Sequence, residues 1–131
     1  MNIEQFRAYC LSLPFTAEKT PFAGFFPNAR DILAFYVCAK IFCYFDLDKF
    51  DKCSLKCTPE RITELKERYQ AAGNPFNMSP RHWLSIRFND DLPDALLLDL
   101  VQHSYTLVRA SLPKKQREHL GEPVRGIGEG A

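Results

Sequence analysis

The sequence lacks the features that would assign a chain of this size to a specialised class. Its five cysteines include no C-x2-C pair, so neither a zinc ribbon nor a thioredoxin-like redox site is indicated. No apolar run approaches the roughly 18 residues of a membrane span, and Glu4 and Arg7 interrupt the N-terminal apolar pattern as no signal peptide would. We therefore expect a cytoplasmic protein with reduced, mostly buried thiols, no membrane contact, no metal and no cofactor.

Excess charge is also missing, because the formal net charge is only +1. Any affinity for nucleic acid must then come from local clusters of Lys and Arg rather than from overall attraction. At 131 residues, 46% of them hydrophobic, the chain is long enough to build one core without disulfides. We predict a single domain over residues 1–120 and a flexible C-terminal tail over 121–131, where large apolar residues are almost absent.

Hydrophobic periodicity predicts a chain of alternating short strands and helices. Asn2 and Gln5 form a capping-box pattern for a helix that Pro14 ends, and Thr58 and Pro59 are typical of a second helix start. A long helix should follow the N-cap acceptors of Asn89 to Asp91. The remaining expected elements are a weak edge strand at 18–24, strands at 32–37, 40–45, 52–57 and 83–88, and a short basic helix from Pro113. This order indicates an α+β fold of two layers.

The segment from Asp31 to Cys57 is unusual because its strands are apolar on both faces. If Leu33, Phe35 and Val37 point to the helices, the opposite face of the sheet, here called the outer face, needs a function. That face would carry aromatic and cationic side chains, namely Tyr36, Lys40, Phe42, Tyr44, Lys56, Trp83 and Arg87. Aromatic residues interleaved with cations suit single-stranded nucleic acid, whereas the same surface could equally serve a homodimer, another protein partner or packing under loops.

Two further groups carry candidate functional residues. Arg81, His82 and Trp83 stand where a loop meets a strand and could contact a phosphate, although Trp83 could simply anchor the loop. Lys114 and Lys115 begin a basic cluster that either pairs with phosphates or forms a solvated helix face. Asp99 precedes His103 by one helical turn, so we expect the carboxylate to raise the basicity of the imidazole. No pattern in the chain specifies catalytic residues.

Several segments together resemble one known family. D-I-L-A-F-Y-V, S-L-K-C-T-P-E-R, R-H-W, H-S-Y-T-L-V and L-P-K-K, at these separations, resemble the MmcQ/YjbR-like proteins from near residue 1 to about 120. The resemblance implies a twisted antiparallel sheet of about five strands with helices packed on one face, likened to secretion chaperones. It also implies a non-enzymatic DNA-binding protein with a double-wing motif. The alternative is a protein-interaction or dimerisation module that uses the outer sheet face.

Overall fold

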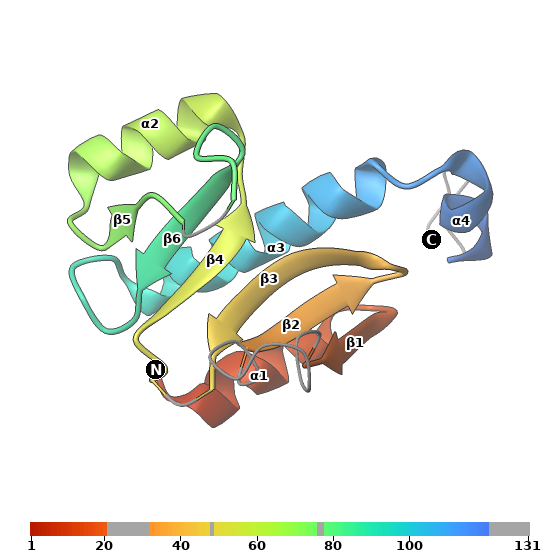
Figure 1. Ribbon diagram of the computed structural model, residues 1–131, viewed down its shortest axis with the longest axis horizontal. Helices are drawn as coiled ribbons and strands as arrows, with labels where there is room; N and C mark the ends of the chain where they lie inside the picture. The colour runs from red at the N-terminus through yellow and green to blue at the C-terminus, as the bar shows by residue number, and fades with distance from the viewer. Residues whose placement is uncertain (21–31, 48, 76–77, 121–131) are drawn as a thin grey trace.

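The computed structural model describes residues 1–20, 32–47, 49–75 and 78–120. Its strands form one antiparallel sheet of six strands in the order β1-β2-β3-β4-β6-β5, with helices packed against it (Figure 1). The elements in chain order are α1 (Ile3–Ser12), β1 (Thr16–Lys19), β2 (Ile32–Val37), β3 (Lys40–Asp46), β4 (Lys52–Lys56), α2 (Pro59–Arg68), β5 (Ala72–Gly73), β6 (Trp83–Arg87), α3 (Asp94–Ala110) and α4 (Lys114–His119). The predicted α+β fold is confirmed, and the tail predicted at 121–131 lies outside the described residues.

The first helix forms as the sequence predicts. The Asn2 side chain accepts from the backbone N–H of Gln5 at 2.8 Å, and the Gln5 side chain accepts from that of Asn2 at 3.0 Å, which completes the capping box. The helix places Phe6 and Cys10 fully in the core. The edge strand that follows, β1, covers Thr16–Lys19, so it lies earlier than expected, and residues 21–24 of the predicted strand are outside the described residues.

A β-bulge interrupts the central hairpin, and no sequence pattern indicated it. Phe35 of β2 pairs with Cys43 of β3, but the next residue, Tyr36, pairs with Ile41. Phe42 is thus an extra residue on β3, and both Phe42 and Cys43 are fully buried although they are adjacent. Because a bulge lets neighbouring side chains leave strict alternation, Phe42 turns toward the core instead of the outer face.

The starts and ends of the later helices differ in detail from expectation. Pro59 opens α2 as predicted, but Thr58 makes no side-chain capping bond. The helix ends at Arg68, and the short strand β5 that follows was not predicted. Pro93, rather than Asn89 to Asp91, is the N-cap of α3. The Asp91 carboxylate instead accepts from the backbone N–H groups of Gln70 and Ala71, at 2.7 and 2.9 Å, and so holds the turn before β5.

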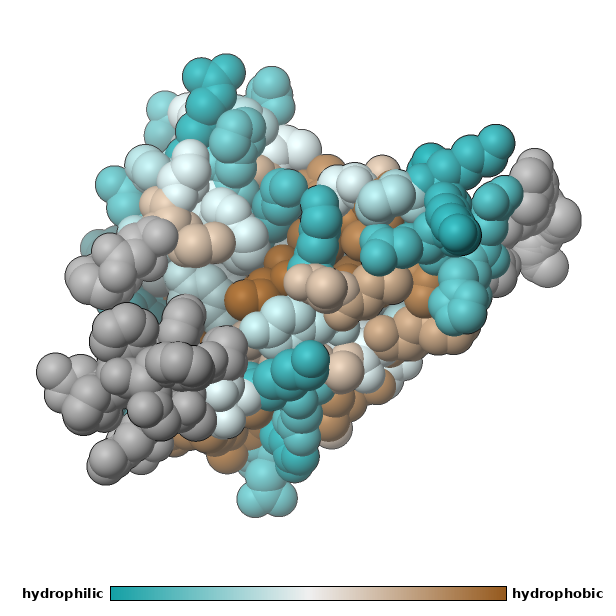
Figure 2. All heavy atoms as spheres, turned by 45° about the vertical axis from the view of Figure 1, so that its right-hand side comes forward, coloured by the Kyte–Doolittle hydropathy of each residue, from teal (hydrophilic) through white to brown (hydrophobic). Residues whose placement is uncertain are grey.

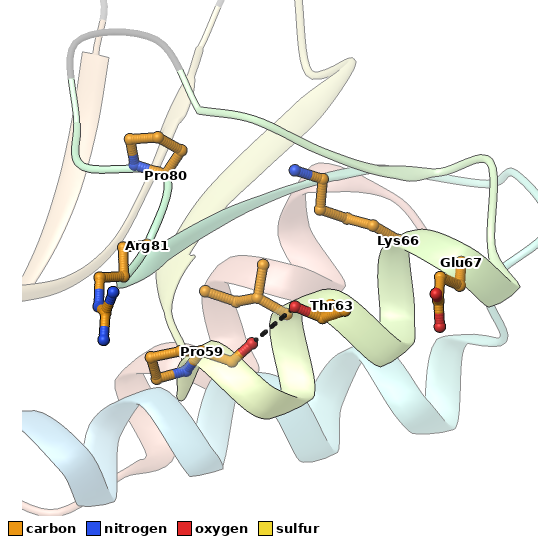
Figure 3. Close-up of a pocket in the computed structure, with 7 residues that line it drawn as sticks. Pro59, Thr63, Lys66, Glu67, Pro80 and Arg81 are labelled. Atoms are coloured by element: carbon orange, nitrogen blue, oxygen red, sulfur yellow. Dashed lines mark hydrogen bonds between the residues drawn. The ribbon is translucent and has the colours of Figure 1, made fainter.

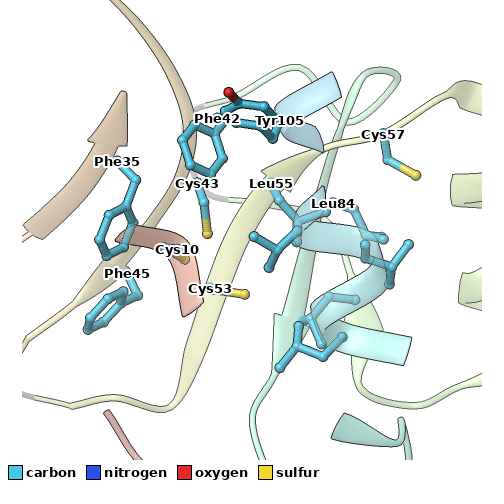
Figure 4. Packing of buried hydrophobic residues seen from close by; sticks show 14 of the residues in the cluster. Cys10, Phe35, Phe42, Cys43, Phe45, Cys53, Leu55, Cys57, Leu84 and Tyr105 are labelled. Atoms are coloured by element: carbon cyan, nitrogen blue, oxygen red, sulfur yellow. The ribbon is translucent and has the colours of Figure 1, made fainter. Parts of the chain in front are cut away.

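The core lies on one side of the sheet. Leu33, Phe35 and Val37 are buried as predicted, and α3 crosses behind β3 and β4 in the view of Figure 1. Aromatic rings join the layers, because Phe6 of α1 meets Phe45 edge-on at 5.7 Å and Tyr105 of α3 meets Phe42 edge-on at 5.3 Å. Figure 4 shows Phe35, Phe42 and Phe45 near Cys43 and Cys10, and the buried cysteines are all free thiols. The outer face is therefore the side of the sheet that these helices leave uncovered.

Candidate functional site

Strand register places one set of side chains together on the outer face. Tyr44 pairs with Ser54, and Ser54 pairs with Ser85, so these three form a row across β3, β4 and β6. The neighbouring rows pair Lys56 with Trp83 and Lys52 with Arg87. Side chains two residues apart on a strand share a face, as do residues paired across two strands, so the outer-face positions of these strands are Ala17, Lys19, Ile32, Ala34, Tyr36, Ile41, Tyr44, Asp46, Lys52, Ser54, Lys56, Trp83, Ser85 and Arg87.

Two large aromatic side chains meet above the serine row. The ring centroids of Tyr44 and Trp83 are 6.2 Å apart, and the ring planes are inclined at 46°. Ser54 and Ser85 beneath them are buried, with 6% and 5% of their surfaces exposed. Burial raises the pKa of Tyr44, while its hydrogen bond with Ser54 acts in the opposite direction. Tyr44 therefore keeps its phenolic proton at neutral pH and contributes a neutral ring beside the indole.

Positive charge surrounds these aromatic rings. Lys19 places its Nζ 5.5 Å from the centre of the Tyr36 ring, a cation–π contact at the β1 side of the sheet. Lys52 and Lys56 form no ion pair among the described residues, whereas Arg87 contacts the Asp90 carboxylate at 2.9 Å. Among the described strand residues, the outer-face positions thus carry four cations, Lys19, Lys52, Lys56 and Arg87, against one carboxylate, Asp46. The face is more positive than the nearly neutral chain.

Hydrophobic and hydrophilic side chains both reach the surface of the molecule (Figure 2). In Figure 2 hydrophobic surface occupies the middle of the molecule, with hydrophilic side chains gathered around it. Apolar rings between charged side chains suit a ligand with flat faces and negative groups. The surface offers no metal site, because no cluster of three or more His, Cys, Asp or Glu in the described ranges could hold an ion. Nor is any helix of this part of the chain both long and apolar enough to cross a membrane.

The structure brings together only part of the predicted site. Tyr36, Tyr44, Lys56, Trp83 and Arg87 lie on the outer face. The placement of Lys40 there is wrong, because Lys40 pairs with the core-facing Val37 and is exposed at the hairpin end of β3. The placement of Phe42 on this face is wrong, since the bulge buries it against Tyr105. Lys114 and Lys115 are exposed on α4, which lies at the opposite end of the molecule from α2 and is separated from β6 (Figure 1).

Sequence reasoning missed outer-face residues that strict alternation could have found. Lys52 and Ser54 precede Lys56 by four and two residues on β4, and Ser85 stands between Trp83 and Arg87 on β6. Lys19 was within the predicted edge strand, yet the partner that places it beside Tyr36 is known only from the pairing of β1 with β2. Alternation along β4 and β6 would have placed Lys52, Ser54 and Ser85 on the outer face. The position of Lys19 beside Tyr36 could not be predicted without the pairing of β1 with β2.

The Arg81-His82-Trp83 segment forms the turn that enters β6. Backbone N–H groups of His82 and Trp83 both donate to the Ser79 carbonyl, at 3.2 and 2.9 Å, and the His82 carbonyl accepts from the Cys57 N–H at 2.9 Å. These bonds fix the backbone and leave the Arg81 and His82 side chains exposed. Arg81 also lines a depression of about 450 Å³ between this turn and α2 (Figure 3).

His103 lies apart from this surface, on the side of α3 that faces α2. Its pKa is lowered, first by burial and second by the Arg61 guanidinium, and Asp99 opposes both effects without overcoming them. Asp99 does raise the pKa of this imidazole, as expected, but burial and Arg61 outweigh it and the imidazole is less basic than usual. Asp99 also pairs with Arg61 at 3.2 Å across the two helices, and the buried Nε2 of His103 has no hydrogen-bond partner in the described part of the chain.

Comparison with known proteins assigns the chain to a family. The family model described as YjbR matches residues 11–107, which include every strand and the greater part of α3. The chain belongs to the YjbR family. This confirms the resemblance seen in the SLKCTPER, RHW and HSYTLV segments, and it places the Tyr44 and Trp83 pair inside the YjbR region.

Relatives of this YjbR protein cover nearly its whole length. The uncharacterized protein YbdF of Escherichia coli O157:H7 is 26% identical over 118 residues, which are 89% of this chain and 92% of YbdF. The crystal structure of Deinococcus radiodurans protein DR2400, with a DUF419 domain, matches with a TM-score of 0.79. The two sequences are 26% identical, and the match covers 99% of this chain and 95% of DR2400. The crystal structure of a Pseudomonas syringae protein shares the fold, with a TM-score of 0.67. That protein is 23% identical, and the match covers 82% of this chain and 98% of the Pseudomonas protein.

Proposed function

We propose that this YjbR protein binds single-stranded nucleic acid, DNA foremost, on the outer face of its sheet. The observation that carries the proposal is the Tyr44 and Trp83 ring pair on the same face as the ammonium groups of Lys52 and Lys56. Bases can stack on the rings while the cations follow the phosphates, an arrangement that is tolerant of sequence because every base has a flat π face. The described strands supply no set of base-reading side chains, so we expect little sequence preference.

Affinity should be modest and strongly dependent on salt. Four cations on the face set an upper bound on the phosphates that it can neutralise, and Arg87 is already paired with Asp90. For single strands the slope of log K against log salt is about −0.7 per neutralised phosphate, which gives about −2 for three contacts. The net charge of +1 adds little long-range attraction. Binding in the micromolar range at low salt is the expected result.

The first experiment titrates fluorescently labelled oligodeoxythymidylate and a duplex of the same length at two salt concentrations. Trp83 is the only tryptophan, so quenching of its fluorescence reports stacking at the proposed site directly. Trp83→Ala should weaken binding by about tenfold or more, since stacking contributes about 1–3 kcal/mol per base. Wild-type protein that leaves the single strand unbound at about 100 μM in low salt would refute the proposal.

Cation variants locate the phosphate contacts. Lys56→Ala should reduce the salt slope by about 0.7, whereas Lys49→Ala removes an exposed ammonium from the β3–β4 loop and should leave the slope unchanged. Lys114 and Lys115 remain a separate predicted contact at the far end of the molecule. A double Lys114→Ala, Lys115→Ala variant tests whether a longer strand reaches α4, because its effect should increase with oligonucleotide length.

The competing use of this face is an interface with a second copy or another protein. A dimer formed through the outer face would cover Tyr44 and Trp83, so it would remove the stacking surface. Light scattering of the free protein and of the oligonucleotide complex separates the two, since nucleic-acid binding predicts a monomer that increases in mass by one strand. A stable dimer that resists Trp83 quenching would favour the interface instead.

A further inference from the structure

The two chain segments that bear Lys56 and Trp83 continue past the sheet and then separate around a pocket. Lys56 and Trp83 are paired across β4 and β6, and one residue farther the Cys57 N–H donates to the His82 carbonyl at 2.9 Å. Beyond this bond one segment becomes α2 and the other becomes the Ser79 to His82 turn. The pocket between them has a volume of about 450 Å³, within the range of small-ligand sites.

The pocket has an apolar floor and a charged rim. Pro59, Ile62 and Pro80 supply apolar surface, and Thr63, Lys66, Glu67 and Arg81 complete the lining. The Thr63 hydroxyl donates back to the Pro59 carbonyl at 3.2 Å, and the Lys66 ammonium donates to the Asn74 side chain. Two of the polar groups are therefore already held by the protein.

Of the two polar groups that remain, Arg81 is the cation and Glu67 is the carboxylate. Arg81 is exposed and has no ion-pair or hydrogen-bond partner among the described residues. Figure 3 shows Arg81 beside Pro59 on one side of the pocket and Glu67 on the opposite side, so the two charges do not neutralise each other locally. An anionic group is thus favoured at the Arg81 side and disfavoured at the Glu67 side.

We propose that this pocket receives the nucleotide adjacent to those stacked on Tyr44 and Trp83. Its base lies against Ile62 and the two prolines, and its phosphate pairs with Arg81. A planar, largely apolar base with an attached anion matches the floor and the cationic end of the rim. The short path from the Lys56 and Trp83 pair to Arg81 allows one continuous strand to occupy both places. This inference rests on the proposed nucleic-acid binding of the outer face.

The test compares variants that alter only the pocket. Arg81→Ala removes the phosphate partner, and Thr63→Phe fills the pocket from an exposed helix position, so neither should disturb the core. Arg68→Ala is the control, because Arg68 is an exposed cation of the same helix outside the lining. With oligodeoxythymidylate of about eight nucleotides, a length within the known site sizes, we expect both pocket variants to bind about five- to tenfold more weakly.

Three readouts distinguish the outcomes. Support requires weaker binding by Arg81→Ala and Thr63→Phe, a salt slope lowered by about 0.7 in Arg81→Ala, and full Trp83 quenching at saturation. Wild-type affinity in both pocket variants, with binding still lost in Trp83→Ala, would overturn the pocket while leaving the proposed function intact. Absence of binding by the wild-type protein would overturn both. If polyglutamate, but not the oligonucleotide, shifts the NMR signals of the backbone amides that line the pocket, the pocket is a peptide site and the inference is overturned.

Discussion

The hydroxyl of Ser104 bridges the backbones of β3 and β4 where the two strands no longer pair directly. Its Oγ donates to the Phe42 carbonyl at 2.5 Å and accepts from the Lys56 N–H at 2.8 Å. The β3–β4 pairing covers only Cys43 to Phe45 on β3, so Phe42 and Lys56 lie where the two strands have separated. A buried side chain of α3 thus completes the backbone hydrogen bonding where β3 and β4 separate, and it fixes the backbone of Lys56 at the end of β4.

Ser104→Ala should reduce the free energy of unfolding by about 1–3 kcal/mol, because it leaves a buried carbonyl and a partly buried N–H without partners. Thr106→Ala is the matched control, since Thr106 is an exposed hydroxyl residue on the same helix. Urea denaturation of both variants gives the comparison. Equal stabilities would mean that water replaces the Ser104 hydroxyl at the strand junction.

Because of the bulge, Phe42 and Tyr44 lie on opposite faces of the sheet and differ in burial, although they are two residues apart on β3. Phe42 is completely buried and contacts the rings of Phe35 and Tyr105, so Phe42→Ala should cost about 3–5 kcal/mol. Tyr44→Ala removes a partly exposed outer-face ring and should cost markedly less. Chemical denaturation measures both effects, and similar losses for the two variants would contradict the placement of Phe42 in the core.

Local patterns predicted the elements better than they predicted the faces. Alternation from Trp83 to Phe88 correctly assigned Leu84 and Ile86 to the core, because β6 is regular. The same reasoning failed at Phe42, since an inserted residue changes side-chain direction without leaving a mark in the composition. Asp91 was also misassigned, because its partners, the amides of Gln70 and Ala71, lie about twenty residues away and are brought near only by the fold.

Asp91 should make stability depend on acid pH. Its pKa is lowered chiefly by the hydrogen bond from the Gln70 N–H, with further bonds and Arg87 acting in the same direction against desolvation. Since the folded-state pKa is below the unfolded value, this stabilisation is complete above about pH 5 and is lost as pH falls through the lowered pKa. Asp91→Asn should unfold at lower temperature at neutral pH, with a difference that shrinks toward about pH 3.

The control for this measurement is Asp51→Asn, at an exposed loop position whose carboxylate holds no backbone N–H among the described contacts. It should follow the wild-type pH profile. Parallel profiles for Asp91→Asn and the wild-type protein would show that ionised Asp91 does not stabilise the turn before β5.

The cysteines should differ in reactivity by position. Cys38 is exposed at the β2–β3 turn, and Cys10, Cys43, Cys53 and Cys57 are buried. Burial is also the main reason that the pKa values of Cys43 and Cys57 are raised, which further lowers their thiolate fractions. A thiol reagent should modify one equivalent rapidly in the native protein and all five cysteines after unfolding in urea. Cys38→Ser should abolish the rapid phase, and a second rapid thiol would contradict the buried arrangement.

His103 should destabilise the fold as the solution becomes mildly acidic. Its pKa in the folded protein lies below the ordinary value of 6.5, because burial and Arg61 disfavour the imidazolium. The unfolded chain therefore binds a proton first, and stability decreases as pH falls through about 6.5 until the folded-state pKa is passed. His103→Gln should remove this part of the pH dependence between about pH 7.5 and 5.5, as measured by urea denaturation, while NMR titration of the wild-type imidazole reports the lowered pKa. A midpoint above 6.5 would show that Asp99, rather than burial and Arg61, controls this histidine.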